Sequence, residues 1–471
     1  MKDENYFFGD SEFHNPALKI ENSEKLGKIH QIVDQYKLNK HQVNKIRNVF
    51  EEEMKNGLSS DQTRKGCLQC ENTFVTDLPT GDEKGDYLSL DLGSTNFRVL
   101  LSRLKGRNEE AQFIVKYYDI PLEIKVGQSQ KLFEHIANCI DDFLNDVPEL
   151  REVHLPLGFT FSFPMVQKAI NIGLLVTWTK CYDLPDVINK NAVEFLQEAL
   201  NKKNLNVDVV AILNDTTGTL VKGAYSHPDC CIGLILGSGF NACYVEKAER
   251  IEKWHDEKHE NVKNVLIDIE CGAFGDDGCI DFIKTEEDFE IDKESLFPGS
   301  FTFEKMFSGT FVGDIVRRIL LKLTSKGLLF EGKVTEKLKE KTSVTSAQVS
   351  LIDNENKDCV ETRKLVADLG YEKYEEDDLR IIEYVCAVVS VRGALLVSIL
   401  MAYLLDYIDR ENATIAIDGS LFAHPKYKTL MTDFISALSN GKKFKLVSAK
   451  DGSGKGAGLV AAIAERLRTR K

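Results

Sequence analysis

The chain has 471 residues, and its 60 Lys and Arg residues against 74 Asp and Glu residues give a formal net charge of −14. This length and a hydrophobic content of 43% predict two or three folded domains and argue against long disordered regions. The negative charge counts against a nucleic-acid-binding protein, because phosphate backbones are bound by basic surfaces, but it does not exclude a bound nucleotide.

The first fourteen residues, MKDENYFFGDSEFH, are acidic and polar, whereas a secretory leader needs a cationic flank and an apolar run. Residues 1–25 lack periodicity, which predicts a flexible N-terminal tail. The most apolar stretch, residues 381–405, is interrupted by Glu383 and Arg392, so we expect one or two buried helices and no membrane segment. Eleven cysteines, an odd number scattered through apolar segments, predict a cytoplasmic protein without a disulfide scaffold.

From Leu26 to Met54 apolar residues recur at steps of three and four, which predicts a helix that stops near Gly57. The middle of the chain alternates strand-like apolar runs with helical periodicity. The run VDVVAIL at 207–213 is typical of a strand covered on both faces, and the alternation predicts an α/β protein. Strands are predicted at 87–90, 97–101, 157–163, 207–213, 231–236, 242–245 and 414–417, and helices at 311–323 and 379–408.

One short sequence occurs twice. Leu-Gly-Ser at 92–94 and again at 236–238 follows an apolar strand and precedes another apolar segment. Two such strand–turn–strand units would fit duplicated halves that face each other, although three small residues can also match by chance.

Three carboxylates follow predicted strands, namely Asp91, Asp215 and Asp418. Ligands of open α/β sheets bind at the carboxyl ends of strands, whereas the alternative is that each Asp only caps a helix. Three such positions, two of them in turns rich in Gly, Ser and Thr, favour a phosphate site. Asp91 beside a polyphosphate would repel it unless a hard cation intervened, which implies Mg²⁺.

The turns themselves suit phosphate. Gly93 and Gly239 allow backbone N–H groups to approach phosphate oxygens, and Thr95 and Ser238 supply hydroxyl donors. Arg98 could add positive charge, or it could form a surface salt bridge.

The segment 451–458, Asp-Gly-Ser-Gly-Lys-Gly-Ala-Gly, is rich in glycine but does not match a P-loop. It could form a flexible wall against a nucleotide, or the first turn of a helix that packs closely on a neighbour.

Three further motifs are weaker. Gly237–Ala242 matches a dinucleotide fingerprint, but a strand follows it where that motif requires a helix. His255 and His259 are spaced as metal ligands on a helix can be, yet a solvated face is the better interpretation. Cys67 and Cys70 form one C-x-x-C without a second pair, so we interpret them as structural or incidental thiols.

Eight motifs occur in the order and spacing of one known family, and together they are very specific. They are Leu90–Arg98, Leu155–Pro164, Trp178–Lys180, Leu213–Gly218, Asn241–Tyr244, Gly272–Asp277, Phe303–Met306 and Asp418–Ser420. Over nearly the whole chain from about residue 26, the sequence resembles the hexokinase family, particularly its single-unit animal members.

The resemblance implies an α/β architecture of two domains, the actin-like (ribonuclease-H-like) ATPase fold, with a ligand cleft between a small and a large domain. The repeated Leu-Gly-Ser would then mark two phosphate hairpins. We expect the tail at 1–25, a small domain at 76–213 plus the C-terminal helix 455–471, and a large domain at 26–75 plus 214–454.

The resemblance also implies the site residues. Asp215 would take the proton from the sugar 6-hydroxyl as it attacks the γ-phosphate, and Lys180 would supply nearby positive charge. The resemblance implies that no residue would bind the metal directly, because Mg²⁺ would arrive with ATP and Asp91 would reach it through water. The implied sugar pocket is Ser162, Thr179, Lys180, Asn214, Asp215, Asn241, Glu270 and Glu304. The implied nucleotide site is Asp91, Gly93, Ser94, Thr95, Asn96, Arg98, Ser238, Gly239, Ser346, Asp418, Gly419, Ser420 and Ser453.

The resulting hypothesis is an ATP:D-hexose 6-phosphotransferase that performs the first step of glycolysis as a cytoplasmic monomer, with glucose, mannose and fructose as substrates. The alternative is a catalytically weak or silent sugar-binding sensor or scaffold. A more distant one, an actin- or chaperone-like ATPase, conflicts with the implied sugar pocket. The sequence departs from the family pattern at Ser94, Cys181, Phe240, Cys271 and Phe297. Ser94 and Phe240 would add bulk to the phosphate turns, which favours the catalytically weak or silent sugar-binding protein.

Overall fold

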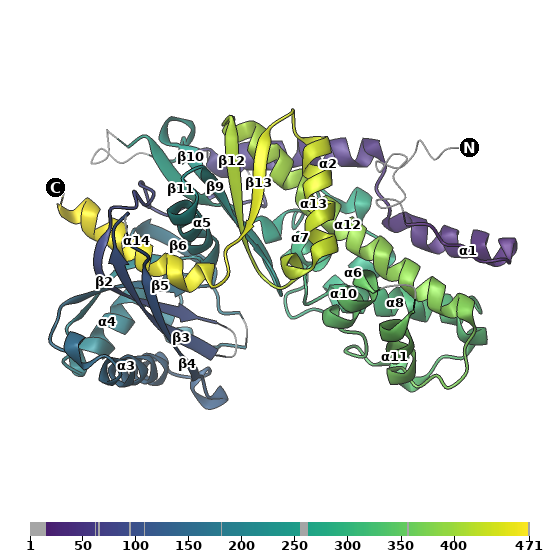
Figure 1. Ribbon diagram of the computed structural model, residues 1–471, viewed down its shortest axis with the longest axis horizontal. Helices are drawn as coiled ribbons and strands as arrows, with labels where there is room; N and C mark the ends of the chain where they lie inside the picture. The colour runs from purple at the N-terminus through teal and green to yellow at the C-terminus, as the bar shows by residue number, and fades with distance from the viewer. Residues whose placement is uncertain are drawn as a thin grey trace.

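The computed structural model describes residues 16–61, 63–64, 66–93, 96–107, 109–179, 181–254, 262–355 and 358–469, without the side chain of Asn96. Two α/β halves lie side by side, and a bundle of helices extends from the second half (Figure 1). The predicted strands are all present, with most bounds displaced by a few residues and that of 207–213 unchanged.

The first half contains a five-stranded sheet in the order β4-β3-β2-β5-β8. Strands β2, β3 and β4 are antiparallel neighbours, and β5 and β8 continue the sheet in parallel with β2. The bounds are β2 Lys84–Leu92, β3 Asn96–Lys105, β4 Gln112–Asp119, β5 Leu155–Phe161 and β8 Val207–Leu213. A separate ribbon is formed by β6 (Met165–Ala169) and β7 (Ile172–Leu175).

The second half contains a six-stranded sheet in the order β1-β11-β10-β9-β12-β13. Its strands β9, β10 and β11 are antiparallel neighbours, and β12 and β13 run parallel to β9. The bounds are β1 Glu71–Asn72, β9 Cys230–Leu236, β10 Phe240–Lys247, β11 Asn264–Asp268, β12 Asn412–Asp418 and β13 Lys443–Ser448. Apart from β1, this is the plan of the first sheet, and the two Leu-Gly-Ser sequences begin at the ends of the equivalent strands β2 and β9. The structure therefore favours duplicated halves over a chance match.

Two helices cross between the sheets and exchange partners. Helix α5 (Asp215–Ser226) follows the first sheet but packs on β9 and β12 of the second, whereas α14 (Gly452–Thr469) follows the second sheet and packs on β2 and β5 of the first. The helices touch at glycines: a Cβ at Gly456 would lie 1.9 Å from the carbonyl oxygen of Gly218. The glycine-rich residues 452–458 thus form the start of a helix that packs closely on a neighbouring helix. This is the second of the two interpretations given for this segment, and not the flexible wall.

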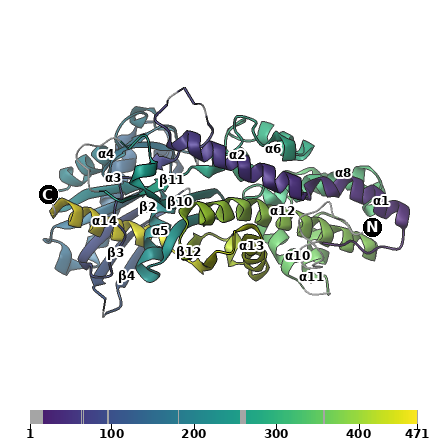
Figure 2. The same cartoon turned by 90° about the horizontal axis from the view of Figure 1, so that it is seen from above.

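The remaining helices cover the outer faces. Helices α3 (Ser129–Asn145) and α4 (Ala192–Lys202) pack on the face of the first sheet opposite α14. In the second half, α2 (Lys40–Leu58), α12 (Glu376–Ile408) and α13 (Pro425–Leu438) share one core with the six-stranded sheet, and α2 runs alongside α12 (Figure 2). The distal bundle contains α1 Ser23–Val33, α6 Glu286–Lys293, α8 Val312–Ser325, α9 Glu336–Lys339, α10 Ser346–Asn354 and α11 Val360–Asp368, whereas α7 Thr302–Lys305 packs into the core of the six-stranded sheet.

The N-terminal helix differs from its prediction. The expected single helix from Leu26 to Met54 is two helices, because a 3₁₀ turn at Asp34–Tyr36 ends α1 and Asn39 caps α2 by accepting from the N–H of Gln42 at 2.9 Å. Within the predicted tail, α1 already begins at Ser23 and Leu18 is buried in the helical core. The other domain boundaries stay a prediction.

Helix α12 is long and apolar enough to cross a membrane by length and composition alone, which corrects the expectation that Glu383 and Arg392 leave it too short. The structure buries 94% of its apolar 18-residue window inside the protein. Since core helices pass the same test, the composition of α12 is weak support for a membrane span.

Candidate active site

A cavity of about 330 Å³ lies where the two halves meet, lined from one side by the loops that follow β5 and β7 and from the other by the β9–β10 turn and the segments after β11. Seven of the eight predicted sugar-pocket residues line it, namely Ser162, Thr179, Asn214, Asp215, Asn241, Glu270 and Glu304. The eighth, Lys180, lies outside the described residues. The cavity also includes Ser238 and Gly239, which the sequence assigned to phosphate.

The first turn of α5 positions Asp215. Asn214 is the N-cap of this helix, and its side-chain oxygen accepts from the N–H of Thr216 at 3.0 Å. The capping function thus belongs to Asn214, and Asp215 is a half-buried residue of the cavity wall at the positive end of the helix dipole. Asn214 also donates from Nδ2 to Oε1 of Glu270 at 3.3 Å, which connects α5 to the opposite wall.

Behind this wall lies a pair of carboxyl groups that the sequence analysis missed in part. Asp268 ends β11, is buried, and accepts from Oγ1 of Thr216 at 3.1 Å and from Nδ2 of Asn241 at 2.8 Å. Burial raises the pKa of Asp268 to about 7, against opposing hydrogen bonds from Glu270 and Asn241. Burial and the neighbouring Asp268 raise the pKa of Glu270 well above its usual range. The pair therefore retains a proton at neutral pH. The available signal was that Asp268, like Asp91 and Asp418, stands at the end of a strand.

We expect Asp268→Asn to change how stability depends on pH. The Asp268 pKa is near 4 in the unfolded chain and about 7 in the folded protein, so the folded state binds more protons and its stability falls as the pH rises between these values. Asn keeps the acceptor for Thr216 and removes this titration. From about pH 5 to about pH 8, urea unfolding should show the variant gaining roughly 1–3 kcal/mol relative to the wild type. Parallel stability curves for the two proteins would contradict the shared proton.

The turn between β9 and β10 is held by Glu304 of α7. The N–H of Phe240 donates to Oε2 of Glu304 at 2.8 Å, and a Cβ at Gly239 would lie 2.9 Å from the same oxygen. The Phe240 side chain is 3% exposed, with its ring 5.6 Å from that of Phe303 and 5.0 Å from that of Phe307. Phe240 thus borders the cavity while its ring packs in the core, and the expectation that its bulk weakens the phosphate turn stays a prediction.

Phe240→Ser should therefore destabilise the fold by about 3 kcal/mol or more, because it leaves a cavity among aromatic rings and buries a hydroxyl. Denaturant unfolding measures this change. Phe289→Ser, at an exposed position on α6, is the matched control and should change stability by about 0.5 kcal/mol or less. An unchanged unfolding midpoint for Phe240→Ser would show that the ring is not a core element.

Four residues predicted or found near the phosphate turns form one network. Arg98 donates from Nη2 to Oδ2 of Asp91 at 2.7 Å and from Nη1 to Oδ1 of Asp451 at 2.6 Å. Ser453 donates to Oδ2 of Asp91 at 2.7 Å. Arg98 is neither a free phosphate ligand nor a surface ion pair, because its charge is shared between two half-buried carboxylates. Asp451 is a residue that the sequence analysis did not assign.

The end of β12 joins the same region. Asp418 accepts from the N–H of Gly452 at 2.9 Å, and burial raises its pKa. Gly419 has φ +126° and a Cβ there would lie 2.2 Å from the carbonyl oxygen of Leu236, so only glycine lets the β9 and β12 turns meet this closely. Ser420, exposed, precedes a 3₁₀ turn.

Of the other residues predicted to bind the nucleotide, some are described by the structure and some are not. Ser346 begins α10 and lines a neighbouring cavity of about 590 Å³, which shares Phe297, Phe301 and Glu304 with the first. The carbonyl of Gly93 accepts from the hydroxyl of Tyr182 at 3.2 Å, a link that the sequence analysis missed. Ser94, Thr95 and the side chain of Asn96 lie outside the described residues.

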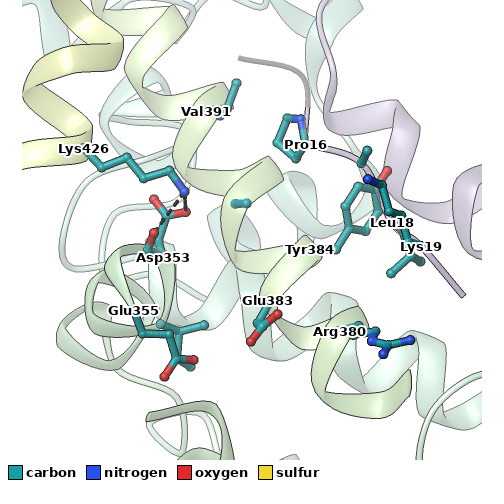
Figure 3. Close-up of a pocket in the computed structure, with 13 residues that line it drawn as sticks. Pro16, Leu18, Lys19, Asp353, Glu355, Arg380, Glu383, Tyr384, Val391 and Lys426 are labelled. Carbon is teal, nitrogen blue, oxygen red and sulfur yellow. Dashed lines mark hydrogen bonds and ion pairs between the residues drawn. The ribbon is translucent and has the colours of Figure 1, made fainter. Parts of the chain in front are cut away.

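A larger cavity of about 720 Å³ lies elsewhere, between the segment from Pro16, the end of α10, α12 and α13 (Figure 3). Its polar wall includes the ion pair between Lys426 and Asp353, with Nζ 2.6 Å from Oδ1 (Figure 3). None of the predicted site residues lines it.

Comparisons with known proteins agree with this geometry. Two family models, both described as hexokinase, match residues 28–225 and 231–463. Hexokinase-1 of Homo sapiens is 37% identical over 462 residues (96% of this chain and 50% of that protein), and hexokinase-2 of Rattus norvegicus is 38% identical over 446 residues (93% and 48%). The chain thus spans about half the length of these curated relatives. A solved hexokinase from Schistosoma mansoni, complexed with glucose, has a TM-score of 0.86 and 35% identity, and the match covers 94% of this chain and 100% of that one. The predicted two-domain actin-like fold is confirmed.

Proposed function

The chain belongs to the hexokinase family, and from this premise we propose that it transfers the γ-phosphoryl group of ATP to the 6-hydroxyl of a hexose, with glucose as the first candidate and mannose and fructose as further substrates. As the first step of glycolysis, this activity suits a cytoplasmic enzyme, and none of the eleven cysteines, all within the described residues, forms a disulfide. We further propose that the enzyme acts as a monomer.

The single observation that carries the proposal is the cavity around Asp215. It combines hydroxyl, amide and carboxyl groups from both halves of the protein within one space of about 330 Å³. Such a set suits a polyol, because each hydroxyl can find a donor or an acceptor and a missing hydroxyl leaves a buried partner unpaired. Asp215 is the proposed base for the 6-hydroxyl, and Lys180 is the proposed nearby cation.

The donor end of the proposed site lies at the turns of the two hairpins. Ser238 and Gly239 border the cavity, and the backbone N–H groups of such a turn suit phosphate oxygens. The carboxylates Asp91, Asp418 and Asp451 converge on the first turn of α14, and such hard oxygen donors fit Mg²⁺ or the water around it. When bound with ATP, Mg²⁺ neutralises developing charge on the phosphates.

A coupled assay with glucose, mannose and fructose, each with and without Mg·ATP, tests this function. We expect hexose-dependent ADP formation that requires Mg²⁺, and release of hexose 6-phosphate. Calorimetric binding of glucose without turnover would instead favour the sugar-binding sensor or scaffold. Neither binding nor turnover with any of the three sugars would contradict the proposal.

A further inference from the structure

A group of two thiols and one carboxylate lies outside the cavity, where the loop after α2 meets the segment that follows Glu270. Cys67, Asp277 and Cys279 place their sulfur and carboxylate oxygen atoms within 4.8 Å of one another. Cys67 belongs to the loop after α2, whereas the other two follow the 3₁₀ turn Cys271–Ala273, so the group joins two segments that are far apart in the sequence. The partner of Cys67 is Cys279, and not the Cys70 of the C-x-x-C motif, whose thiol lies 3.8 Å from the sulfur of Met54.

A second carboxylate lies beside Cys67 but outside the group of three. Glu53 of α2 is 6% exposed, and its Oε2 lies 3.2 Å from Sγ of Cys67. The same oxygen accepts from the backbone N–H of Cys67 at 2.6 Å, which fixes the carboxylate beside the thiol. On the other side, Oδ1 of Asp277 accepts from the N–H of Cys279 at 3.0 Å, so this carboxylate is also held in place.

We propose that Cys67, Cys279 and Asp277 form a binding site for one Zn²⁺ ion, with a water molecule in the fourth position. Two sulfur and two oxygen donors are a set that zinc accepts in tetrahedral geometry, with Zn–S near 2.3 Å and Zn–O near 2.0–2.2 Å. Such bonds put neighbouring donor atoms about 3.3–3.8 Å apart. The donor atoms of Cys67, Asp277 and Cys279 lie within 4.8 Å of one another, so side-chain rotations that shift them by about 1 Å bring them to this spacing. Asp277 is exposed, which gives the ion a path from solvent.

The electrostatics of the group favour a cation over a disulfide. Thiolates are the species that attack in disulfide chemistry, and two adjacent carboxylates oppose their formation. A divalent cation reverses this effect because it stabilises both thiolates and both carboxylates at once.

The site would also connect α2 to the wall of the sugar cavity. The N–H of Gly275 donates to Sγ of Cys67 at 3.3 Å. The adjacent Asp276 accepts from the N–H groups of Phe301 and Thr302 at 3.0 and 2.8 Å, at the start of the helix that contains Glu304. A bound ion would therefore restrict the motion of the segment between Glu270 and Glu304.

The test uses the purified 471-residue chain, reduced and stripped of metal, titrated with Zn²⁺ in competition with a chromophoric chelator. We expect about one Zn²⁺ per chain. Cys67→Ser and Cys279→Ser should each weaken binding at least about tenfold. Cys359→Ser, at a half-buried thiol outside the group, is the matched control and should leave the affinity unchanged.

Two further measurements do not depend on the folding of the cysteine variants. Co²⁺ added to the wild type should give the intense near-ultraviolet absorption of thiolate-to-metal charge transfer. Asp277→Asn, at an exposed position, should weaken Zn²⁺ binding while its thermal melting stays that of the wild type. The proposal is overturned if the wild type binds no Zn²⁺, if binding survives both cysteine variants, or if mass spectrometry finds a Cys67–Cys279 disulfide in a chain that binds none. Each readout is metal binding, so the result does not depend on whether the chain phosphorylates a hexose.

Discussion

Asp215→Asn should lower kcat for hexose phosphorylation by about 10²–10⁴-fold and leave the dissociation constant for glucose nearly unchanged. The amide keeps the size and the hydrogen-bonding capacity of the side chain at the cavity wall, so the sugar keeps its contacts. It cannot take a proton at neutral pH, and proton removal from the attacking hydroxyl is the proposed task of Asp215. The loss should therefore fall on kcat, measured in the coupled assay, and not on the binding enthalpy, measured by calorimetry.

Asp208→Asn is the matched control for this experiment. Asp208 lies on β8, the strand that leads to Asp215, but its side chain is exposed and pairs with His154. The control should show wild-type kcat. If Asp215→Asn kept more than about half of the wild-type kcat, the proton would leave by another route and Asp215 would not be the base.

Gly456→Ala should destabilise the protein by about 3 kcal/mol or more. The new Cβ would lie 1.9 Å from the carbonyl oxygen of Gly218 and 2.4 Å from its carbonyl carbon, and both are backbone atoms of α5 that cannot rotate away. Either α14 withdraws from α5 or both helices shift on their sheets. Equilibrium unfolding in urea measures the change, and hexose phosphorylation should fall with it because α5 begins at the proposed base.

Gly27→Ala provides the control of opposite sign. Gly27 lies in α1, where a Cβ would meet no atom within 4 Å. Since alanine favours a helix over glycine, this variant should gain about 0.5–1 kcal/mol. If Gly456→Ala were as stable as the wild type, the close approach of α5 and α14 would not depend on glycine.

The apolar runs in the sequence predicted the strands well, because a strand that is covered on both faces consists almost entirely of apolar residues. The run 207–213 is strand β8 with the same bounds, and all but one of its residues are buried. The predicted helix from Leu26 to Met54 failed because its periodicity continues across the turn at Asp34–Tyr36. The new helix after this turn begins at the capping box of Asn39 and Gln42, a signal that apolar spacing does not contain.

The site was predictable only in its parts. Three aspartates at strand ends correctly predicted which ends of the strands border the site. The function of Arg98 could not be predicted, because its partners Asp91 and Asp451 are known only from the structure. The proton shared by Asp268 and Glu270 requires burial, which no single segment specifies. The pairing of Cys67 with Cys279 joins residues that only the tertiary fold brings together.

The exchange of helices between the sheets has a consequence for how the chain reaches its native state. The sheet of the first half ends its sequence at Leu213, yet one of its faces is covered by α14, which begins at Gly452. On that face Gly158 and Ser89 are small because the helix presses against them, with Ala457 beside Gly158 and Gly458 beside Ser89. During synthesis this face has no partner until the whole second half has left the ribosome. Such long-range closure slows folding and leaves a sheet face exposed to aggregation meanwhile, so the two halves are expected to complete their folding together and not one after the other.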